Sequence, residues 1–268
     1  MGLKAKKSLG QNFLRDTKIL NDITESAPVI EGDLVLEVGP GEGDLTRVLL
    51  DKGARVYGVE KDSRVIPLLK QKFKKEIEND QYTLSEGDAL DVDPSDFFGR
   101  EQSYRIVANI PYYITGLLIR HFLEAKHRPK SITLVVQKEV AERIATSGKE
   151  SILSLSVKAY GEPHFIRKIE AKHFDPVPKV DSAILHISHI SNTFFAKAPF
   201  TAEEFFRIIK LGFSQKRKVL IKNLSQDYSK DLLKKVFEEL SLLETIRAEQ
   251  LSVNVWRKLL TELKNHTK

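Results

Sequence analysis

The first two-thirds of the chain alternates short apolar runs with amphipathic segments, and this order restricts the possible folds more than any other feature. A short apolar run is typical of a buried parallel strand, and apolar residues spaced three and four apart are typical of a helix. The expected strands cover residues 33–39, 54–60, 82–90, 104–110 and 131–137, and the expected helices cover residues 43–53, 63–78, 115–126 and 138–146. This order predicts an α/β, Rossmann-like fold with an open, doubly wound sheet.

The rest of the chain has two different patterns. Three more apolar runs are expected to be strands that extend the sheet antiparallel, at residues 154–161, 164–170 and 181–190. After a linker, three amphipathic segments each begin at a Ser or Thr that can cap a helix, at residues 201–224, 229–242 and 252–266. We therefore expect a large domain over residues 1–195 and a small helical domain over residues 200–268.

The composition excludes several classes of site. The chain has no cysteine, which excludes a disulfide framework, a thiolate metal site and a cysteine nucleophile, and which fits a reducing cytoplasm. No apolar run approaches the ~20 residues of a membrane span. The seven histidines are scattered and form no clustered ligand set. We therefore expect neither a membrane segment nor a metal site.

Positive charge is concentrated at the two ends of the chain. The formal net charge is +6 at pH 7. Residues 201–268 hold 14 Lys and Arg against 9 Asp and Glu, and the first twenty residues hold 5 against 1. Two basic ends around a nearly balanced middle favour a polyanionic partner such as nucleic acid.

A glycine-rich stretch, EVGPGEG from Glu37 to Gly43, separates the first expected strand from the first expected helix. Glycines let the backbone approach a ligand closely, and ligands of such sheets bind at the carboxyl ends of the strands. The glycine spacing differs from that of dinucleotide sites, Pro40 lacks an N–H, and Glu42 would repel phosphate. A nucleoside without phosphates fits better, and S-adenosylmethionine fits because its ammonium and sulfonium groups are cationic.

Acidic residues follow the next two expected strands as well. Glu60 ends the second strand, where a carboxylate can accept hydrogen bonds from both ribose hydroxyls. Asp88 follows the third strand and can accept a hydrogen bond from an adenine amino group. Each carboxylate alone would be read as a solvated loop residue or a helix cap. Together with the glycine-rich stretch, they indicate a nucleoside pocket.

The stretch VANIPYYITG, from Val107 to Gly116, places one amide and two tyrosines at the end of a buried strand. A simple turn would instead have Gly, Asp or Ser at these positions. We therefore interpret the stretch as a pocket wall, with Asn109 as its polar group.

Eight segments of the chain occur in the order found in the ribosomal RNA adenine-N6 dimethyltransferases, and the chain resembles that family. They are KKSLGQNFL, LEVGPGEG, VYGVEKD, EGDAL, NIPYYIT, VVQKEVAERI, HFDPVPKVDSA and FSQKRKVLIKNL, and they run from about Lys6 to about Trp256. HFDPVPKVDSA is more similar to the small-subunit (16S) rRNA branch than to the erythromycin-resistance branch, which modifies large-subunit rRNA. Tyr113 departs from the family, which often has Asn there.

The resemblance implies a fold and an activity. The fold is that of the S-adenosylmethionine-dependent methyltransferases, with a small C-terminal helical domain. Methyl groups pass from S-adenosylmethionine to N6 of two adjacent adenines in a hairpin loop near the 3′ end of small-subunit rRNA, during ribosome biogenesis.

The resemblance also assigns cofactor contacts to six residues, Asn12, Leu14, Gly39, Glu60, Asp88 and Asn109. Asn12 and Leu14 would close over the cofactor, and Gly39 would approach its methionine part. The two carboxylates would bind the ribose and the adenine, as expected from their positions. Asn109 would lie between the cofactor and the target base.

Catalysis requires the lone pair of adenine N6 to be localised, because it is delocalised into the ring. The side-chain oxygen of Asn109 and, by family analogy, the carbonyl of Ile110 would accept hydrogen bonds from N6 and stabilise its developing positive charge. Pro111 would stiffen the turn. Tyr112 would stack on the flipped adenine, and Phe174 would cover its opposite face.

The C-terminal segment contains a basic cluster, formed by Lys216, Arg217, Lys218 and Lys222. We expect these residues to lie within about two turns of one helix and to contact rRNA phosphates, although a solvated charged face is the simpler reading.

Two alternatives stay open at this point. The chain could be a large-subunit rRNA adenine-N6 methylase that confers macrolide resistance, or a ribosome-assembly factor that binds RNA without catalysis. The intact Asn109-Ile-Pro-Tyr112 argues against the second alternative. We expect a cytoplasmic monomer whose partner is small-subunit rRNA or the immature small subunit.

Overall fold

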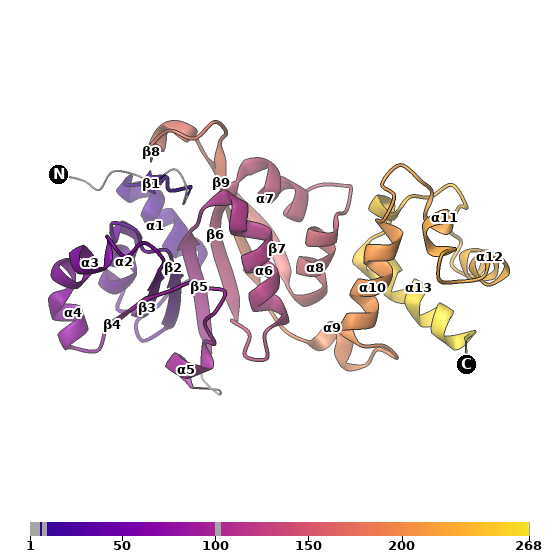
Figure 1. Ribbon diagram of the computed structural model, residues 1–268, viewed down its shortest axis with the longest axis horizontal. Coiled ribbons are helices and arrows are strands. Elements are labelled where there is room, and N and C mark those ends of the chain that lie inside the picture. Colours follow the sequence, from indigo (N-terminus) through magenta and orange to yellow (C-terminus); the bar gives the residue numbers. More distant parts are fainter. Residues whose placement is uncertain (1–5, 7–9, 100–102, 268) are drawn as a thin grey trace.

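A seven-stranded sheet forms the centre of the larger part of the molecule (Figure 1). The computed structural model describes residues 6, 10–99 and 103–267. The strands lie in the order β4-β3-β2-β5-β6-β9-β7, and their bounds are β2 Leu34–Val38, β3 Arg55–Glu60, β4 Tyr82–Glu86, β5 Tyr104–Asn109, β6 Ser131–Gln137, β7 Glu162–Ile169 and β9 Ser182–Ser188. The first five strands are parallel, and β9 pairs antiparallel with both β6 and β7. The predicted doubly wound sheet and its antiparallel extension are confirmed.

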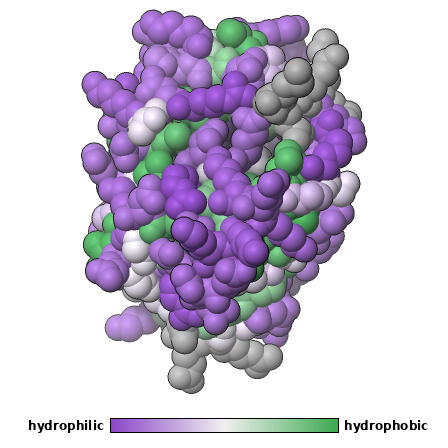
Figure 2. All heavy atoms as spheres, turned by 90° about the vertical axis from the view of Figure 1, so that its left-hand side faces the viewer, coloured by the Kyte–Doolittle hydropathy of each residue, from purple (hydrophilic) through white to green (hydrophobic). Residues whose placement is uncertain are grey.

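Helices cover both faces of this sheet because successive strand residues point to opposite sides. On β2, for example, Val35 packs with the residues of α1, α2 and α3, whereas Leu36 packs with those of α6 and α8. The helices of this part are α1 Thr17–Ser26, α2 Asp44–Asp51, α3 Ile66–Lys72, α4 Lys74–Glu78, α5 Ser95–Phe98, α6 Thr115–Glu124, α7 Lys138–Ala145 and α8 Ile152–Tyr160. The end of the molecule that carries α3 and α4 is mostly hydrophilic (Figure 2).

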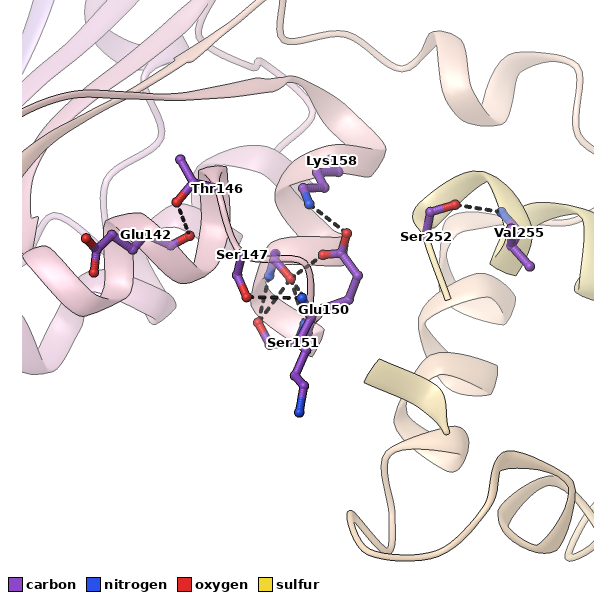
Figure 3. Close-up of polar contacts among 10 residues, drawn as sticks. Glu142, Thr146, Ser147, Glu150, Ser151, Lys158, Ser252 and Val255 are labelled. Atoms are coloured by element: carbon purple, nitrogen blue, oxygen red, sulfur yellow. Dashed lines mark hydrogen bonds and ion pairs between the residues drawn. The ribbon is translucent and has the colours of Figure 1, made fainter. Parts of the chain in front are cut away.

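The prediction of a strand at residues 154–161 is wrong, because α8 occupies this segment. Ser151 begins the helix with a capping box, in which its hydroxyl accepts from the N–H of Ser154 at 3.1 Å and its own N–H donates to the Ser154 hydroxyl at 2.7 Å. Figure 3 shows the polar contacts at this helix start. Because α8 is packed against α6, α7, α10 and α13, most of its residues are buried and its helical period is hidden.

The C-terminal residues form a cluster of helices, with the bounds α9 Thr193–Ala196, α10 Ala202–Gly212, α11 Leu220–Leu224, α12 Lys230–Glu239 and α13 Val253–Asn265. Thr201, Ser229 and Ser252 cap three of these helices, as the sequence predicts. The segment 201–224 is not one helix, since residues 213–219 form a turn between α10 and α11. In the described part of the chain, no helix has both the length and the apolar character needed to cross a membrane.

The two parts of the molecule share a continuous hydrophobic core. The ring of Tyr160 at the end of α8 lies 5.2 Å from that of Phe195 and 6.0 Å from that of Phe206, measured between centroids. The N–H of Glu150, in the loop before α8, donates to the carbonyl of Glu249 at 2.7 Å. The division at residues 195–200 stays a prediction.

Gly212 gives a test of the C-terminal core. A Cβ at this position would lie 2.4 Å from Cη2 of Trp256, which is fully buried, and 2.9 Å from Cδ1 of Leu220. We expect Gly212→Ala to lower the free energy of unfolding by about 1–3 kcal/mol through overpacking, as measured by urea denaturation. Gly148→Ala is the control, because a Cβ at Gly148 would have no atom within 4 Å. Equal stability of the two variants would contradict this packing.

Candidate active site

One pocket of about 1080 Å³, counting the space open to solvent, lies at the carboxyl ends of β2, β3, β4 and β5. It is lined by all ten residues that the sequence assigns to the cofactor and to catalysis, namely Asn12, Leu14, Gly39, Glu60, Asp88, Asn109, Ile110, Pro111, Tyr112 and Phe174. These residues come from six separate stretches of the chain. The structure therefore brings together the whole predicted set, and the role of each residue stays a prediction.

The glycine-rich loop opens its backbone to this pocket. Gly39 and Gly41 have φ values of +68° and +58°, which favour glycine. A Cβ at Gly39 would have no atom within 4 Å, so the peptide at this position can be approached closely by a ligand. The N–H of Gly41 donates to Oε2 of Glu60 at 2.9 Å and thereby fixes the loop.

Glu60 lies at the end of β3 and is 5% exposed. Its Oε1 accepts a hydrogen bond from the N–H of Asp62 at 2.8 Å, so both oxygens of the carboxylate bind backbone. Burial raises the pKa of Glu60, while these N–H groups act in the opposite direction. The carboxylate is thus held by the loops after β2 and β3, facing the pocket.

Asp88, after β4, is already paired. Its Oδ2 accepts from Nζ of Lys61 at 2.7 Å, and its Oδ1 accepts from the N–H of Leu90 at 3.0 Å. The bond to Lys61 and then the bond to Leu90 lower the pKa of Asp88. A ligand that uses this carboxylate must share it with the exposed Lys61 or displace Lys61.

Glu37 is a pocket residue that the sequence reading did not single out. It lies on β2, is 1% exposed, and accepts a hydrogen bond from the Thr46 hydroxyl at 2.6 Å. Burial raises the pKa of Glu37 to about 8, and the nearby charge of Glu60 acts in the same direction. A glutamate inside an otherwise apolar strand, Leu34–Val38, was the signal that could have identified it.

Asn109 ends β5 and is oriented by the N-terminal segment. Its Nδ2 donates to the carbonyl of Asn12 at 3.2 Å, which leaves its Oδ1 as the acceptor of the side chain. Tyr112 begins the short 3₁₀ helix η2 (Tyr112–Ile114), and its hydroxyl lies 2.6 Å from that of Ser182 on β9. The turn after β5 therefore places two groups in the pocket: the oriented amide of Asn109 and the ring of Tyr112, which is tethered through its hydroxyl.

The N-terminal segment is fastened across the pocket by a small second sheet. β1 (Phe13–Leu14) pairs antiparallel with β8 (Phe174–Asp175), so that Leu14 lies opposite Phe174. Arg15 bridges Glu42 at 2.8 Å and Asp175 at 3.1 Å. Phe174 is 3% exposed and packs in the core as well as lining the pocket. The pairing joins two segments about 160 residues apart in the sequence.

The prediction that the basic cluster lies on one helix is wrong. Lys216, Arg217 and Lys218 are in the turn between α10 and α11, and only Lys222 is in α11. The side chain of Asn223 holds the turn, since its Nδ2 donates to the carbonyls of Gly212 at 2.5 Å and Gln215 at 3.2 Å. All four basic residues are exposed. In Figure 1 the turn lies at the upper edge of the molecule, as β1 and β8 do, but toward the C-terminal end.

Among residues 6, 10–99 and 103–267, one group of three side chains could hold a metal ion. It consists of Glu239, Glu262 and His266, near the ends of α12 and α13, and none of these residues lines the pocket. The expectation of a site without metal stays a prediction.

Comparison with known proteins gives consistent similarities. The sequence model described as ribosomal RNA adenine dimethylase matches residues 2–265. Proteins named ribosomal RNA small subunit methyltransferase A are 39% identical in Dehalococcoides mccartyi, over 97% of this chain and 89% of the relative, and 38% identical in Fusobacterium nucleatum, over 97% and 98%. A solved dimethyladenosine transferase from Plasmodium falciparum is 28% identical with a TM-score of 0.80, covering 95% of this chain and 98% of that chain. The 23S rRNA methyltransferase ErmE is 27% identical with a TM-score of 0.74, covering 94% and 100%.

The raised pKa of Glu37 predicts a specific pH dependence of stability. The pKa of Glu37 is about 8 in the folded protein, whereas that of an ordinary glutamate is 4.5. The folded protein therefore keeps a proton that the unfolded chain loses, and stability falls as the pH rises from 4.5 to 8. Relative to Glu37→Gln, which keeps an acceptor for Thr46, the wild-type unfolding free energy should fall by up to about 1.4 kcal/mol per pH unit in this window. Urea titrations at pH 5, 6, 7 and 8 measure the difference. Parallel pH profiles would show that Glu37 is ionised in the folded protein.

Proposed function

The chain belongs to the ribosomal RNA adenine dimethylase family, and from this premise we propose that it methylates small-subunit rRNA. The reaction is the transfer of methyl groups from S-adenosylmethionine to N6 of two adjacent adenines in a hairpin loop near the 3′ end of 16S rRNA. Its product is N6,N6-dimethyladenosine, formed during ribosome biogenesis. The small-subunit substrate is supported by three curated relatives at 38–39% identity, whose names specify the small subunit.

The charge of the pocket carries the proposal for the methyl donor. Its described lining contains four acidic side chains besides Glu37, whose raised pKa keeps it mostly protonated at neutral pH, and one cationic side chain. The four are Glu42, Asp44, Glu60 and Asp88, against Lys61. Such a lining repels phosphates and favours a ligand with positive charges. S-adenosylmethionine meets this requirement with its ammonium and sulfonium groups, and when bound it supplies an electrophilic methyl group.

The chain's own residues would divide the binding of this cofactor among them. Glu60, with a carboxylate fixed by two backbone N–H groups, would receive the ribose hydroxyls, and Asp88 would receive the adenine amino group. Gly39 leaves room for the methionine part. Asn12 and Leu14 lie on the N-terminal segment that closes this side of the pocket.

The target adenine would enter beside Asn109. Nδ2 of Asn109 donates to the Asn12 carbonyl. Oδ1 of Asn109 would accept a hydrogen bond from N6, and the Ile110 carbonyl would be the second acceptor. These acceptors would localise the N6 lone pair and stabilise the positive charge on N6 as it takes the methyl group. The methyl–sulfur bond of the sulfonium would break in the same step and leave a neutral thioether, after which N6 would lose a proton. Tyr112 would stack on the base, and Phe174 would cover its other face, since both line the pocket.

The same premise leads to the partner and the compartment. We propose that the protein acts as a monomer on small-subunit rRNA or the immature small subunit in the cytoplasm, where ribosomal subunits are assembled. The exposed turn with Lys216, Arg217 and Lys218 would contact phosphates.

A methyl-transfer assay tests the reaction. Small subunits that lack the modification are incubated with the protein and S-adenosylmethionine, and nucleosides are quantified by mass spectrometry. We expect N6,N6-dimethyladenosine with the wild-type protein and a loss of about a hundredfold or more in rate with Asn109→Ala, because an aligned acceptor is removed. Asn265→Ala, at the end of α13, is the control.

Two results would contradict the proposal. One is full activity of Asn109→Ala. The other is modification of large-subunit rRNA in place of the small subunit, which would support the alternative function and can be checked by macrolide susceptibility of cells that express the protein.

The RNA contact of the basic turn has its own test. We expect replacement of Lys216, Arg217 and Lys218 by Gln to weaken RNA binding and to reduce the slope of log K against log[salt] by about 2–3, because phosphate contacts release counterions. The matched control replaces Lys70, Lys74 and Lys75 of α3 and α4, at the opposite end of the molecule (Figure 1). If both triple variants have the same slope, the basic turn is a solvated surface.

A further inference from the structure

Tyr113 lies at the pocket mouth and has no role in the function proposed above. Its side chain is 66% exposed, although it lines the same pocket as Tyr112. The two neighbouring tyrosines are held differently, because Tyr112 is tethered to Ser182 on β9 whereas Tyr113 is exposed. An aromatic ring exposed at the mouth of a pocket is a surface on which a flat ligand can stack.

The contacts of Tyr113 place its ring on the cofactor side of the mouth. A Cβ at Gly10 would lie 3.3 Å from Cε1 of Tyr113 and 3.3 Å from Cβ of Pro111, so the ring rests against the N-terminal segment where Gly10 has no side chain. Gln11, next to Gly10, donates from its Nε2 to Oδ2 of Asp62 at 2.9 Å. Asp62 follows Lys61, whose Nζ donates to Asp88 at 2.7 Å. Tyr113 therefore lies near the carboxylate proposed to bind the adenine.

The residues proposed to hold the target base have other neighbours. Tyr112 is bound to β9, and Phe174 is paired with Leu14 in the small sheet. Tyr113 instead rests against Gly10 and lines the pocket together with Lys61, which follows β3. An adenine held by Asp88 would thus be the purine nearest to this ring.

We propose that Tyr113 is a cofactor-contact residue whose ring stacks on the adenine of the methyl donor and covers it at the pocket mouth. This inference rests on the proposed function, because it assumes that the pocket binds a donor with an adenosine group. The ring covers the purine on the solvent side, while Asp88 binds its edge. A substitution at this position changes the affinity for the donor and its product without changing the catalytic amide.

Titration calorimetry with two adenosine ligands tests this inference. S-adenosylhomocysteine is the reaction product, and 5′-methylthioadenosine carries the same nucleoside without the amino acid. We expect Tyr113→Asn to weaken the binding of both ligands by about five- to tenfold, as the loss of a single stacked ring does. Tyr113→Phe keeps the ring and is expected to stay within about twofold of wild type, which separates stacking from the hydroxyl.

The outcomes distinguish this inference from the proposed function. Equal dissociation constants for wild type and Tyr113→Asn, when the wild type binds both ligands, would overturn the role of Tyr113 alone. The same holds if Tyr113→Asn loses affinity for an rRNA hairpin and keeps its affinity for both ligands, since the ring would then be a platform for an RNA base. If the wild type binds neither ligand, the proposed methyl donor is wrong, and this inference is wrong with it.

Discussion

The pocket depends on the way in which Glu60 connects three loops. Its carboxylate accepts the N–H groups of Gly41, after β2, and Asp62, after β3, and its own carbonyl accepts the N–H of Gly87, after β4, at 2.9 Å. A glycine-rich loop has a high conformational entropy when it is free, so these bonds are needed to keep it in one conformation. The position of this buried carboxylate therefore fixes the shape of the pocket at the ends of β2 and β3.

The pocket also depends on a segment that covers it at the carboxyl ends of the strands. Parallel strands alone leave their carboxyl ends open to water. Here the pairing of β1 with β8 and the bridge from Arg15 to Glu42 and Asp175 fasten the N-terminal segment over that edge. The Asn12 carbonyl in this segment then orients Asn109. The segment that closes the pocket thus also orients Asn109. Under the proposed function, this arrangement would couple donor binding to the position of the target base.

Six of the ten residues that meet in the pocket were assigned through the family resemblance. Local patterns in the sequence predicted the other four, Gly39, Glu60, Asp88 and Asn109, together with the alternation of strands and helices and the capped C-terminal helices. Such features are encoded by residues near one another along the chain. The strand predicted at residues 154–161 was wrong because α8 is buried among other helices, and its apolar residues follow no helical period. Two other features depend on tertiary contacts between distant residues, so no local pattern could reveal them. They are the pairing of Leu14 with Phe174 and the raised pKa of the buried Glu37. The turn at residues 213–219 interrupts a continuous amphipathic pattern, and the side chain that holds it, Asn223, lies beyond the turn.

The central claim is that the loops joined by Glu60 form the binding site for the methyl donor. Hydrogen–deuterium exchange with and without S-adenosylhomocysteine measures this site directly, because it reports on the backbone amides of each loop. The account predicts slower exchange in peptides that cover Gly39 to Gly43, Asp62 and Leu90, with α12 and α13 unchanged. Protection confined to the C-terminal helices, or exchange in the glycine-rich loop that the ligand leaves unchanged, would contradict it.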